Sequence, residues 1–456
     1  MIFFIALFSN RVLNFILIPL FAFLSTPDET GLFIVFVAYQ TFLSLATKVG
    51  GDSYIATLKM EYEKDLNGYY LYLKKLAYTL SKAHLVGLLM TLSFGFFLYD
   101  FKYLISLFFS VIVLNFILLL SSHYRVSENK SQFVMYSLVA PLFGNVIFFT
   151  CVLFNFNFVD SFLARSLFIS PLIFLFIFKF KKIVLNNFEM TKKMKGEYMH
   201  FGGPLIVHGL FMCGLSYLDR FFINYFYGSE SVAYYSIPYS IASALNIFFI
   251  VLLSSMAPLI IKRLKLRRSK ITECVFFLFN FCYVLFLLVV LLTSEKVIYI
   301  LYGEVYSEKW FIAPLSTIAF GVLIPYYTYI NYLFSQSRTK LIAINSGIAL
   351  FVNFIIIFAF GGVVGLENIP YLNIVSNSVM SIILLFFIGS EINKINKSVL
   401  FGFVFLNFLL VFLIFSFEYS YFLFFIICFL IFIALFYNAK IKKKYFFTLF
   451  NLRGGG

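Results

Sequence analysis

The fold class follows from apolar stretches such as Phe403-Val-Phe-Leu-Asn-Phe-Leu-Leu-Val-Phe-Leu-Ile-Phe415. This stretch lacks the alternation of polar and apolar side chains that marks a membrane-spanning β-strand. It is typical of a helix surrounded by hydrocarbon, and such a helix needs about 20 mostly apolar residues. The whole chain of 456 residues is 62% hydrophobic and only 12% charged, well outside the range of soluble globular domains. We therefore predict an all-α polytopic membrane protein.

Apolar segments of spanning length recur from end to end and predict about fourteen transmembrane helices. They lie at 2–25, 31–56, 75–98, 103–122, 132–154, 159–180, 200–226, 231–261, 273–293, 311–334, 341–363, 369–389, 398–416 and 420–438. The first segment has no preceding basic region and no small-residue cleavage site. We expect it to be retained as a helix and not removed as a signal peptide.

Lys and Arg are distributed unevenly between the two ends of these helices. Of the 35 basic residues, 27 lie in loops on one side, three lie on the other side and five lie within predicted helices. Basic loops stay in the cytoplasm, so we predict that both termini are cytoplasmic. The net charge of +15 then follows from topology and from attraction to anionic membrane lipids, and we expect no nucleic-acid partner.

The helices divide at the longest basic loop. We predict a six-helix lobe over 1–180, a basic cytoplasmic linker over 181–199, a second six-helix lobe over 200–390, two additional helices over 391–438 and a basic cytoplasmic tail over 439–456. The segments Glu29-Thr-Gly-Leu-Phe33 and Glu230-Ser-Val-Ala-Tyr234 share a pattern at an offset of 201 residues. Because six helices separate them, the pattern predicts a parallel pseudo-repeat with a binding cavity between two bundles. Chance similarity within a low-complexity membrane sequence is the competing explanation.

Charged residues within the predicted helices are the main candidates for a functional site. A charge inside a bilayer costs at least about 2.5–3.5 kcal/mol on insertion scales, so it usually marks a pathway or a site. The basic candidates are Arg11, Lys48, Lys82, Arg165 and Arg220, and only Asp52 and Asp219 oppose them. This surplus of positive charge predicts that an anion is bound within the membrane. Arg suits phosphate because its planar fork donates paired hydrogen bonds.

Most of these residues also have a purely structural explanation. Lys82, Arg165 and Arg220 lie close enough to helix ends for their charged groups to reach the membrane surface. Lys48 and Asp52 are four residues apart on one helical face and can neutralise each other.

Arg11 and two titratable residues need separate treatment. Arg11 lies near mid-membrane, where a functional role is the better explanation, although helix-end carbonyls are alternative partners. His208 and Asp219 are eleven residues apart, nearly three turns, and share one face of a helix. We name Asp52, His208 and Asp219 as candidates for coupling to H⁺ or Na⁺, because His changes charge near physiological pH. A polar packing contact between helices is the alternative for the His208–Asp219 pair.

Five stretches carry a family resemblance: Arg11–Phe21, Pro27–Phe33, Gly203–Gly209, Leu218–Ile223 and Leu301–Tyr306. In these stretches the chain resembles the O-antigen and polysaccharide flippases of the multidrug/oligosaccharidyl-lipid/polysaccharide exporter (MOP) superfamily. The resemblance implies transport of undecaprenyl-diphosphate-linked oligosaccharide from the cytoplasmic to the periplasmic leaflet of the bacterial inner membrane, for example during lipopolysaccharide synthesis. It also implies alternating access, antiporter-type ion coupling and no cofactor. A polysaccharide polymerase and a chain-length regulator are the expected protein partners.

Two other functions stay open. A drug exporter of the same superfamily needs intramembrane carboxylates for cationic substrates, whereas this chain has an excess of the opposite charge. A membrane polysaccharide polymerase or glycosyltransferase handles the same lipid-linked sugars but usually has a substantial external loop, and the longest external segment here is 294–310. The sequence has no Walker loop, zinc motif or nucleophile elbow. We therefore expect a transporter and not an enzyme, without a metal site.

Overall fold

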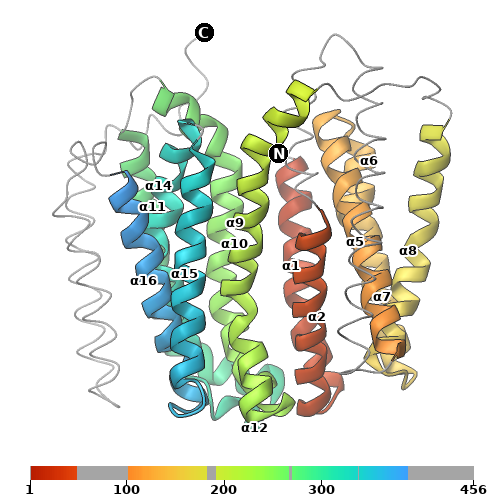
Figure 1. Cartoon of the computed structure of the whole chain (residues 1–456). Coiled ribbons are helices and arrows are strands. Elements are labelled where there is room, and N and C mark those ends of the chain that lie inside the picture. The colour runs from red at the N-terminus through yellow and green to blue at the C-terminus, as the bar shows by residue number, and fades with distance from the viewer. Residues whose placement is uncertain (1, 49–100, 182–191, 266–269, 337, 389–456) are drawn as a thin grey trace. The chain divides into compact units, whose positions relative to one another are not determined.

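The computed structural model describes residues 2–48, 101–181, 192–265, 270–336 and 338–388. These segments are helical apart from short turns, and none of them contains a strand (Figure 1). Among the described residues, nine helices are long and apolar enough to cross a membrane. The predicted all-α membrane fold is confirmed. The predicted helices at 75–98, 398–416 and 420–438 lie outside the described residues, so the total of fourteen stays a prediction.

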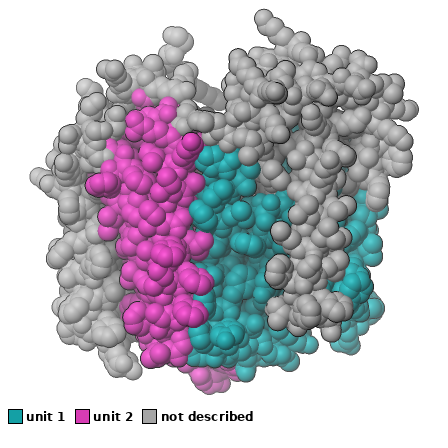
Figure 2. Space-filling model, viewed as in Figure 1, with its two compact units in different colours: residues 1–233 teal, residues 234–456 magenta. Residues whose placement is uncertain are grey.

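The described residues divide into two compact units, Met1–Ala233 and Tyr234–Gly456, which Figure 2 colours separately. The helices of the first unit are α1 (Ile2–Leu24), α2 (Pro27–Lys48), α5 (Phe101–Val126), α6 (Lys130–Val134), the π-helix η1 (Met135–Val139), α7 (Ala140–Leu153), α8 (Phe158–Lys181) and α9 (Lys192–Tyr227). Helix α9 belongs to this unit because it packs along α2. The lobe boundaries predicted at 180 and 200 stay a prediction.

Helix α10 (Ser229–Lys265) begins at the end of the first unit and continues into the second. The other elements of the second unit are α11 (Lys270–Tyr302), α12 (Glu304–Ser307), α13 (Ile312–Gly321), α14 (Ile324–Ser335), α15 (Thr339–Phe360), the short 3₁₀ helix η2 (Leu366–Asn368) and α16 (Ile369–Phe387). The predicted span at 132–154 corresponds to α6, η1 and α7 together, and the span at 311–334 corresponds to α13 and α14.

Aromatic side chains form much of the interior of the first unit. Phe33 and Phe36 of α2 contact Phe162 of α8, with ring centroids 5.7 and 4.7 Å away. Phe148 of α7 also contacts Phe162, at 4.9 Å. Large rings bury much apolar area and pack as offset or tilted pairs. The cluster thus fixes α2, α7 and α8 against one another near the turn that joins α7 to α8.

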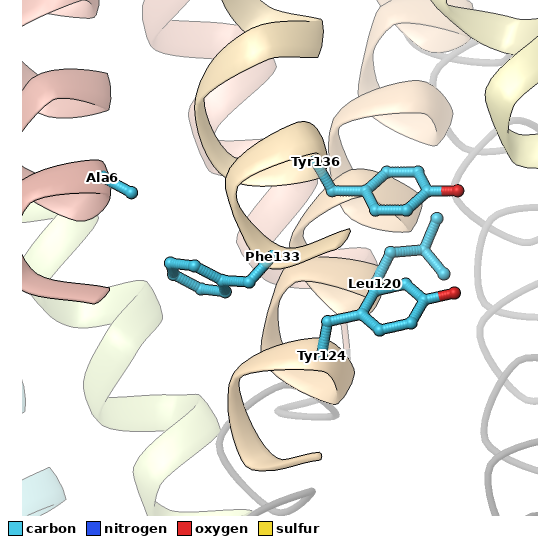
Figure 3. Close-up of a cluster of buried hydrophobic side chains, with 5 residues drawn as sticks. All are labelled: Ala6, Leu120, Tyr124, Phe133 and Tyr136. Atoms are coloured by element: carbon cyan, nitrogen blue, oxygen red, sulfur yellow. The ribbon is translucent and has the colours of Figure 1, made fainter. Parts of the chain in front are cut away.

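A second aromatic contact lies beside the π-helix. The rings of Tyr124 and Tyr136 are stacked at 5.4 Å, and Figure 3 shows their hydroxyls pointing in the same direction, away from Ala6 of α1. The π-helix ends just before Pro141, which has no N–H to donate to the carbonyl of Ser137. Widened turns of this kind accommodate such a defect within a long helix.

The core of the second unit is the broken helix formed by α13 and α14. All residues of α13 and nearly all of α14 are buried, and the two helices are separated at Val322 and Leu323. Two side chains of α16 bond to carbonyl groups near the break: Asn377 Nδ2 donates to the Ala319 carbonyl at 2.9 Å and Ser381 Oγ donates to the Val322 carbonyl at 2.7 Å. Neighbouring polar side chains are what makes an interrupted helix tolerable inside a membrane.

Each unit contains an ion pair between a Lys and a carboxylate at equivalent positions. Lys102 Nζ lies 2.7 Å from Asp160 Oδ1 in the first unit, and Lys309 Nζ lies 2.5 Å from Glu367 Oε1 in the second. The residues of each pair are 58 positions apart. The second pair follows the first by 207 residues at both ends, close to the offset of 201 found in the sequence. This correspondence supports an internal repeat.

Candidate functional site

The candidate site lies where α9 packs along α2 in the first unit. Helix α9 runs without interruption from Lys192 to Tyr227, although Pro204 lies inside it. Pro removes one backbone hydrogen bond from a helix, and a membrane bundle tolerates this loss. The helix therefore carries His208 and, three turns later, Asp219 and Arg220 on one continuous rod.

Asp219 and Arg220 form an ion pair in the protein interior. Arg220 Nη1 lies 2.7 Å from Asp219 Oδ1, and Arg220 is only 5% exposed and Asp219 only 1%. Arg220 Nη1 also donates to the carbonyl of Ser216 at 2.6 Å, and the Arg220 backbone N–H donates to Asp219 Oδ1 at 2.9 Å. An uncompensated buried charge costs several kcal/mol, and here each charge is compensated by the other. The Arg220 guanidinium therefore already has a countercharge, and any anion that binds to this guanidinium has to compete with the Asp219 carboxylate.

Aromatic residues of α9 and α2 pack around the ion pair. The guanidinium carbon of Arg220 lies 5.4 Å from the ring centroid of Tyr217, a cation–π distance. Tyr217 is hydrogen-bonded to Thr41 of α2. One turn further along, Phe221 packs against Tyr39 of α2 with ring centroids 4.7 Å apart. The pair is thus fixed by contacts before and after it along α9.

A polar contact that the sequence did not indicate fixes the far end of α2. Ser44 Oγ donates to Asn115 Oδ1 at 2.5 Å, and Asn115 Nδ2 donates to Thr47 Oγ1 at 2.9 Å. All three residues are buried. They link α2 to α5 directly before Lys48, the last residue of α2. The spacing of Ser44 and Thr47, three residues apart on one helical face, is the signal by which sequence reasoning could have found this contact.

Several predicted site residues fall at the margins of the described structure. Arg11 lies within α1 and Lys48 ends α2, and the structure describes these positions as helix without describing the side chains. Lys82 and Asp52 lie outside the described residues. The predicted Lys48–Asp52 contact and the predicted binding of an anion by the intramembrane cations therefore stay predictions.

The structure separates two of the other predicted residues from the ion pair. His208 lies on α9 but about 16 Å from Asp219 along the helix axis, at about 1.5 Å per residue, so the two side chains do not form a direct pair. Arg165 lies on α8, which packs chiefly along α5 and α7. Its guanidinium carbon lies 5.6 Å from the ring centroid of Phe162. Among the predicted residues whose side chains the structure describes, only Asp219 and Arg220 are brought together.

Comparison with known proteins now identifies the family. Residues 1–264, more than half of the chain, match the family described as polysaccharide biosynthesis protein. The chain belongs to this family. The predicted resemblance is thereby confirmed at the level of the family, and no curated protein matches the chain.

Solved structures agree with this assignment at the level of the fold. This family member is similar to the MATE multidrug transporter DinF-BH in a ligand complex, with a TM-score of 0.60 at 12% sequence identity over 86% of this chain and 94% of that chain. It is also similar to the outward-facing conformation of a multidrug resistance MATE family transporter of the MOP superfamily, with a TM-score of 0.57 at 13% identity over 87% and 96% of the two chains. The chain is thus a multi-pass membrane protein with a transporter fold.

Proposed function

We propose that this protein is a flippase that moves undecaprenyl-diphosphate-linked oligosaccharide from the cytoplasmic to the periplasmic leaflet by alternating access. The observation that carries the proposal is the family match to polysaccharide biosynthesis on a chain with a MATE transporter fold. Sugars and diphosphate do not enter hydrocarbon unaided, because burying a charged or polar group without partners is unfavourable. A polysaccharide built on a lipid carrier therefore needs a protein that shields this head group.

The diphosphate follows the intramembrane cations in this proposal. Arg11, Lys48, Lys82 and Arg220 supply the positive charge, and Arg165 belongs to the same set of predicted contacts. Arg220 is held by Asp219 at 2.7 Å, so the diphosphate takes the place of that carboxylate as the partner of the guanidinium. Such an exchange keeps the guanidinium paired in both states, which avoids the cost of a bare buried charge.

Ion coupling follows from the same exchange. Once the diphosphate has displaced Asp219, the released carboxylate takes up H⁺ or Na⁺, and it gives up the ion when the pair with Arg220 forms again. Asp52 and His208 remain further candidates for coupling. The field also favours the outward direction: about two negative charges that cross an inside-negative potential of roughly 100 mV gain about 4–5 kcal/mol.

The remaining assignments complete the proposal. The protein lies in the bacterial inner membrane with both termini in the cytoplasm, because 27 of its 35 basic residues lie in loops on one side. Its partners are the lipid-linked oligosaccharide and membrane lipids, together with a polymerase and a chain-length regulator that use the translocated repeat unit. No enzymatic step is assigned to the chain.

Leaflet exchange of a fluorescent polyprenyl-diphosphate oligosaccharide in proteoliposomes tests the function. Wild type is compared with Arg11→Ala and Arg11→Lys at equal amounts of folded protein. Met212→Ala is the matched control, because Met212 lies 201 residues after Arg11. We expect exchange to fall at least tenfold in Arg11→Ala and to stay near wild type in Met212→Ala. Equal exchange in all variants overturns the role of Arg11.

Two further arms separate the proposal from its competitors. A fluorescent lipophilic cation serves as the drug probe; faster export of this probe than of the lipid-linked sugar contradicts the flippase proposal. Analysis of the sugar chains after the assay tests for polymerase activity, and lengthened chains point to an enzyme. We expect unaltered sugar chains and no export of the cationic probe.

A further inference from the structure

A second intramembrane cation, Arg165, lies where α7 packs along α8, an interface that we call the α7–α8 seam. Arg165 takes no part in the Asp219–Arg220 ion pair on α9. The two helices approach closely at Gly144, where an added methyl group would lie 2.5 Å from Ile169 Cδ1 and 3.2 Å from Arg165 Cγ. The aliphatic stem of Arg165 therefore packs directly against the backbone of α7. This contact sets the level of the guanidinium within the seam.

Arg165 has no charge partner in this seam. Within the described part of the chain, its side chain makes no salt bridge and no hydrogen bond, and its guanidinium lies over the Phe162 ring at 5.6 Å. Side chains in a helix lean toward its N-terminus, and Phe162 is one turn nearer to that end. The guanidinium therefore lies about 6 Å along the axis from Phe158, the first residue of α8.

Asn145 lies at the same level on α7 and is also unsatisfied. It follows Gly144 directly and is only 6% exposed, and its Oδ1 has no hydrogen-bond partner in the described structure. A buried carboxamide normally bonds to a neighbour, because leaving it unpaired in an apolar environment is unfavourable. Its amide nitrogen is a donor that can join the guanidinium around an anion. Among the described residues, an unpaired guanidinium on α8 and an unpaired carboxamide oxygen on α7 thus lie at or next to the close approach of the two helices at Gly144.

At the equivalent position of the second unit, the corresponding side chains are hydrogen-bonded to each other. At an offset of 208 residues, Asn145 corresponds to Asn353 of α15 and Arg165 corresponds to Asn373 of α16. Asn353 Nδ2 donates to Asn373 Oδ1 at 3.1 Å and to Ser376 Oγ at 2.9 Å. The second unit therefore has a neutral, hydrogen-bonded pair where the described first unit has an unpaired guanidinium and an unpaired carboxamide oxygen.

The same offset relates the starts of the two helix pairs. Lys130 and Ser131 begin α6, and Arg338 and Thr339 lie at the beginning of α15, also 208 residues later. The comparison of the two seams therefore rests on more than one pair of positions. The replacement of Asn by Arg is specific to the first unit.

The surroundings of the seam are those of a lipid-facing surface. Phe143 and Val146 on α7 are 54% and 53% exposed, and Leu167 and Phe168 on α8 are 54% and 53% exposed. Large apolar side chains at such exposure contact hydrocarbon in a membrane protein. A ligand that enters this seam from the side therefore carries an apolar tail as well as the negative charge that pairs with Arg165.

We propose that the Arg165–Asn145 seam binds the phosphate of a lipid in the leaflet next to the α7–α8 turn. The guanidinium donates paired hydrogen bonds to two phosphate oxygens, and the Asn145 amide supplies another donor. Two lipids carry this group, a glycerophospholipid of the bilayer and the polyprenyl phosphate carrier. The site lies on α7 and α8, whereas the Asp219–Arg220 pair lies on α9, and the proposal rests on the proposed function only where the bound lipid is the polyprenyl carrier.

Lipid binding to the purified, delipidated full chain tests the proposal. Phosphatidylglycerol and polyprenyl phosphate are titrated separately, with diacylglycerol as the phosphate-free control, and bound lipid is counted by native mass spectrometry. We expect a phosphate-bearing lipid to bind at least tenfold more tightly than diacylglycerol. Preference for phosphatidylglycerol identifies a bilayer lipid, and preference for polyprenyl phosphate identifies the carrier.

Variants tie the binding to this seam. We expect Arg165→Gln to weaken phosphate-lipid binding at least tenfold, Arg165→Lys to weaken it less, and Asn373→Arg to add a second site. Lys309→Gln, which removes a partly exposed cation of the second unit, serves as the matched control and should bind as wild type does. Equal binding by wild type and Arg165→Gln, or equal binding of diacylglycerol, overturns the proposal. Leaflet exchange is measured separately with Arg11→Ala, so that failure of the flippase function and failure of this lipid site are distinguishable.

Discussion

The hydroxyl of Ser229 donates a hydrogen bond to the carboxylate of Asp28, and the two residues are 201 positions apart. This is the offset of the sequence pattern shared by Glu29–Phe33 and Glu230–Tyr234. Residues at corresponding positions of the predicted repeat therefore touch each other. The contact joins the start of α2 to the start of α10, and both residues belong to the first unit.

Gly31 makes this contact possible, and replacing it should weaken the fold. A methyl group on Gly31 would lie 1.8 Å from the Ser229 carbonyl oxygen, so Gly31→Ala forces the two helix starts apart. We expect a loss of about 1–3 kcal/mol, as for other overpacked sites, measured by thermal unfolding in detergent. Gly209→Ala is the control because no atom lies within 4 Å of the added methyl group. Equal stability of the two variants contradicts this interpretation.

The Asp219–Arg220 pair should show strong coupling in a double-mutant cycle. Asp219→Leu leaves the Arg220 guanidinium buried without a countercharge, and Arg220→Met does the same to the Asp219 carboxylate; each change costs about 3–5 kcal/mol in comparable sites. The double variant Asp219→Leu/Arg220→Met removes both charges and should be more stable than either single variant. Chemical denaturation of the four proteins measures the coupling. Additive effects would show that the two charges do not depend on each other.

The two exposed ion pairs should contribute little. The side chains of Lys102 and Asp160 are 60% and 25% exposed, and those of Lys309 and Glu367 are 32% and 43% exposed. Water and salt screen such pairs, so Glu367→Gln should change stability by no more than about 1 kcal/mol. Unfolding at low and at high salt checks this expectation. A larger loss that persists at high salt would assign these pairs a structural role.

The break between α13 and α14 should depend on α16. Asn377→Leu and Ser381→Ala each leave a carbonyl near the break without its side-chain donor, and an unsatisfied buried group costs about 1–3 kcal/mol. Ser378→Ala is the matched control, because its hydroxyl bonds to the Ile374 carbonyl within α16 at 2.7 Å. Thermal unfolding should rank both test variants below the control. The opposite ranking would mean that the break is stable without α16.

The positions of the helices were predictable because hydrocarbon imposes one requirement on every span. Each backbone N–H and C=O must be bonded within the segment, so an apolar run of sufficient length becomes a helix whatever its neighbours are. For this reason, the predicted spans that fall on described residues coincide with helices. The breaks within the spans were not predicted in the same way: the separation of α13 from α14 depends on donors from Asn377 and Ser381, which lie more than fifty residues later.

The candidate site was predictable only in part. Asp219 and Arg220 are adjacent, so their pairing was visible in the sequence, whereas their enclosure by Tyr217 and Thr41 required the packing of α9 on α2. The predicted pairing of His208 with Asp219 rested on helical periodicity alone. Eleven residues place the two side chains on one face but nearly three turns apart, about 16 Å along α9, so a role of each residue in ion coupling stays a prediction.

The sequence by itself determined the membrane class, the helices and the set of charges that hydrocarbon has to accommodate, since these depend on local composition and on the 3.6-residue period of a helix. Only the tertiary structure decided what surrounds those charges. The packing of α9 on α2 places Tyr217 and Thr41 beside the Asp219–Arg220 pair, and the stem of Arg165 packs against Gly144 of α7. The physical reason is that the free energy of a buried charge depends on all the groups within a few ångströms, and helices that are distant in the sequence supply part of them.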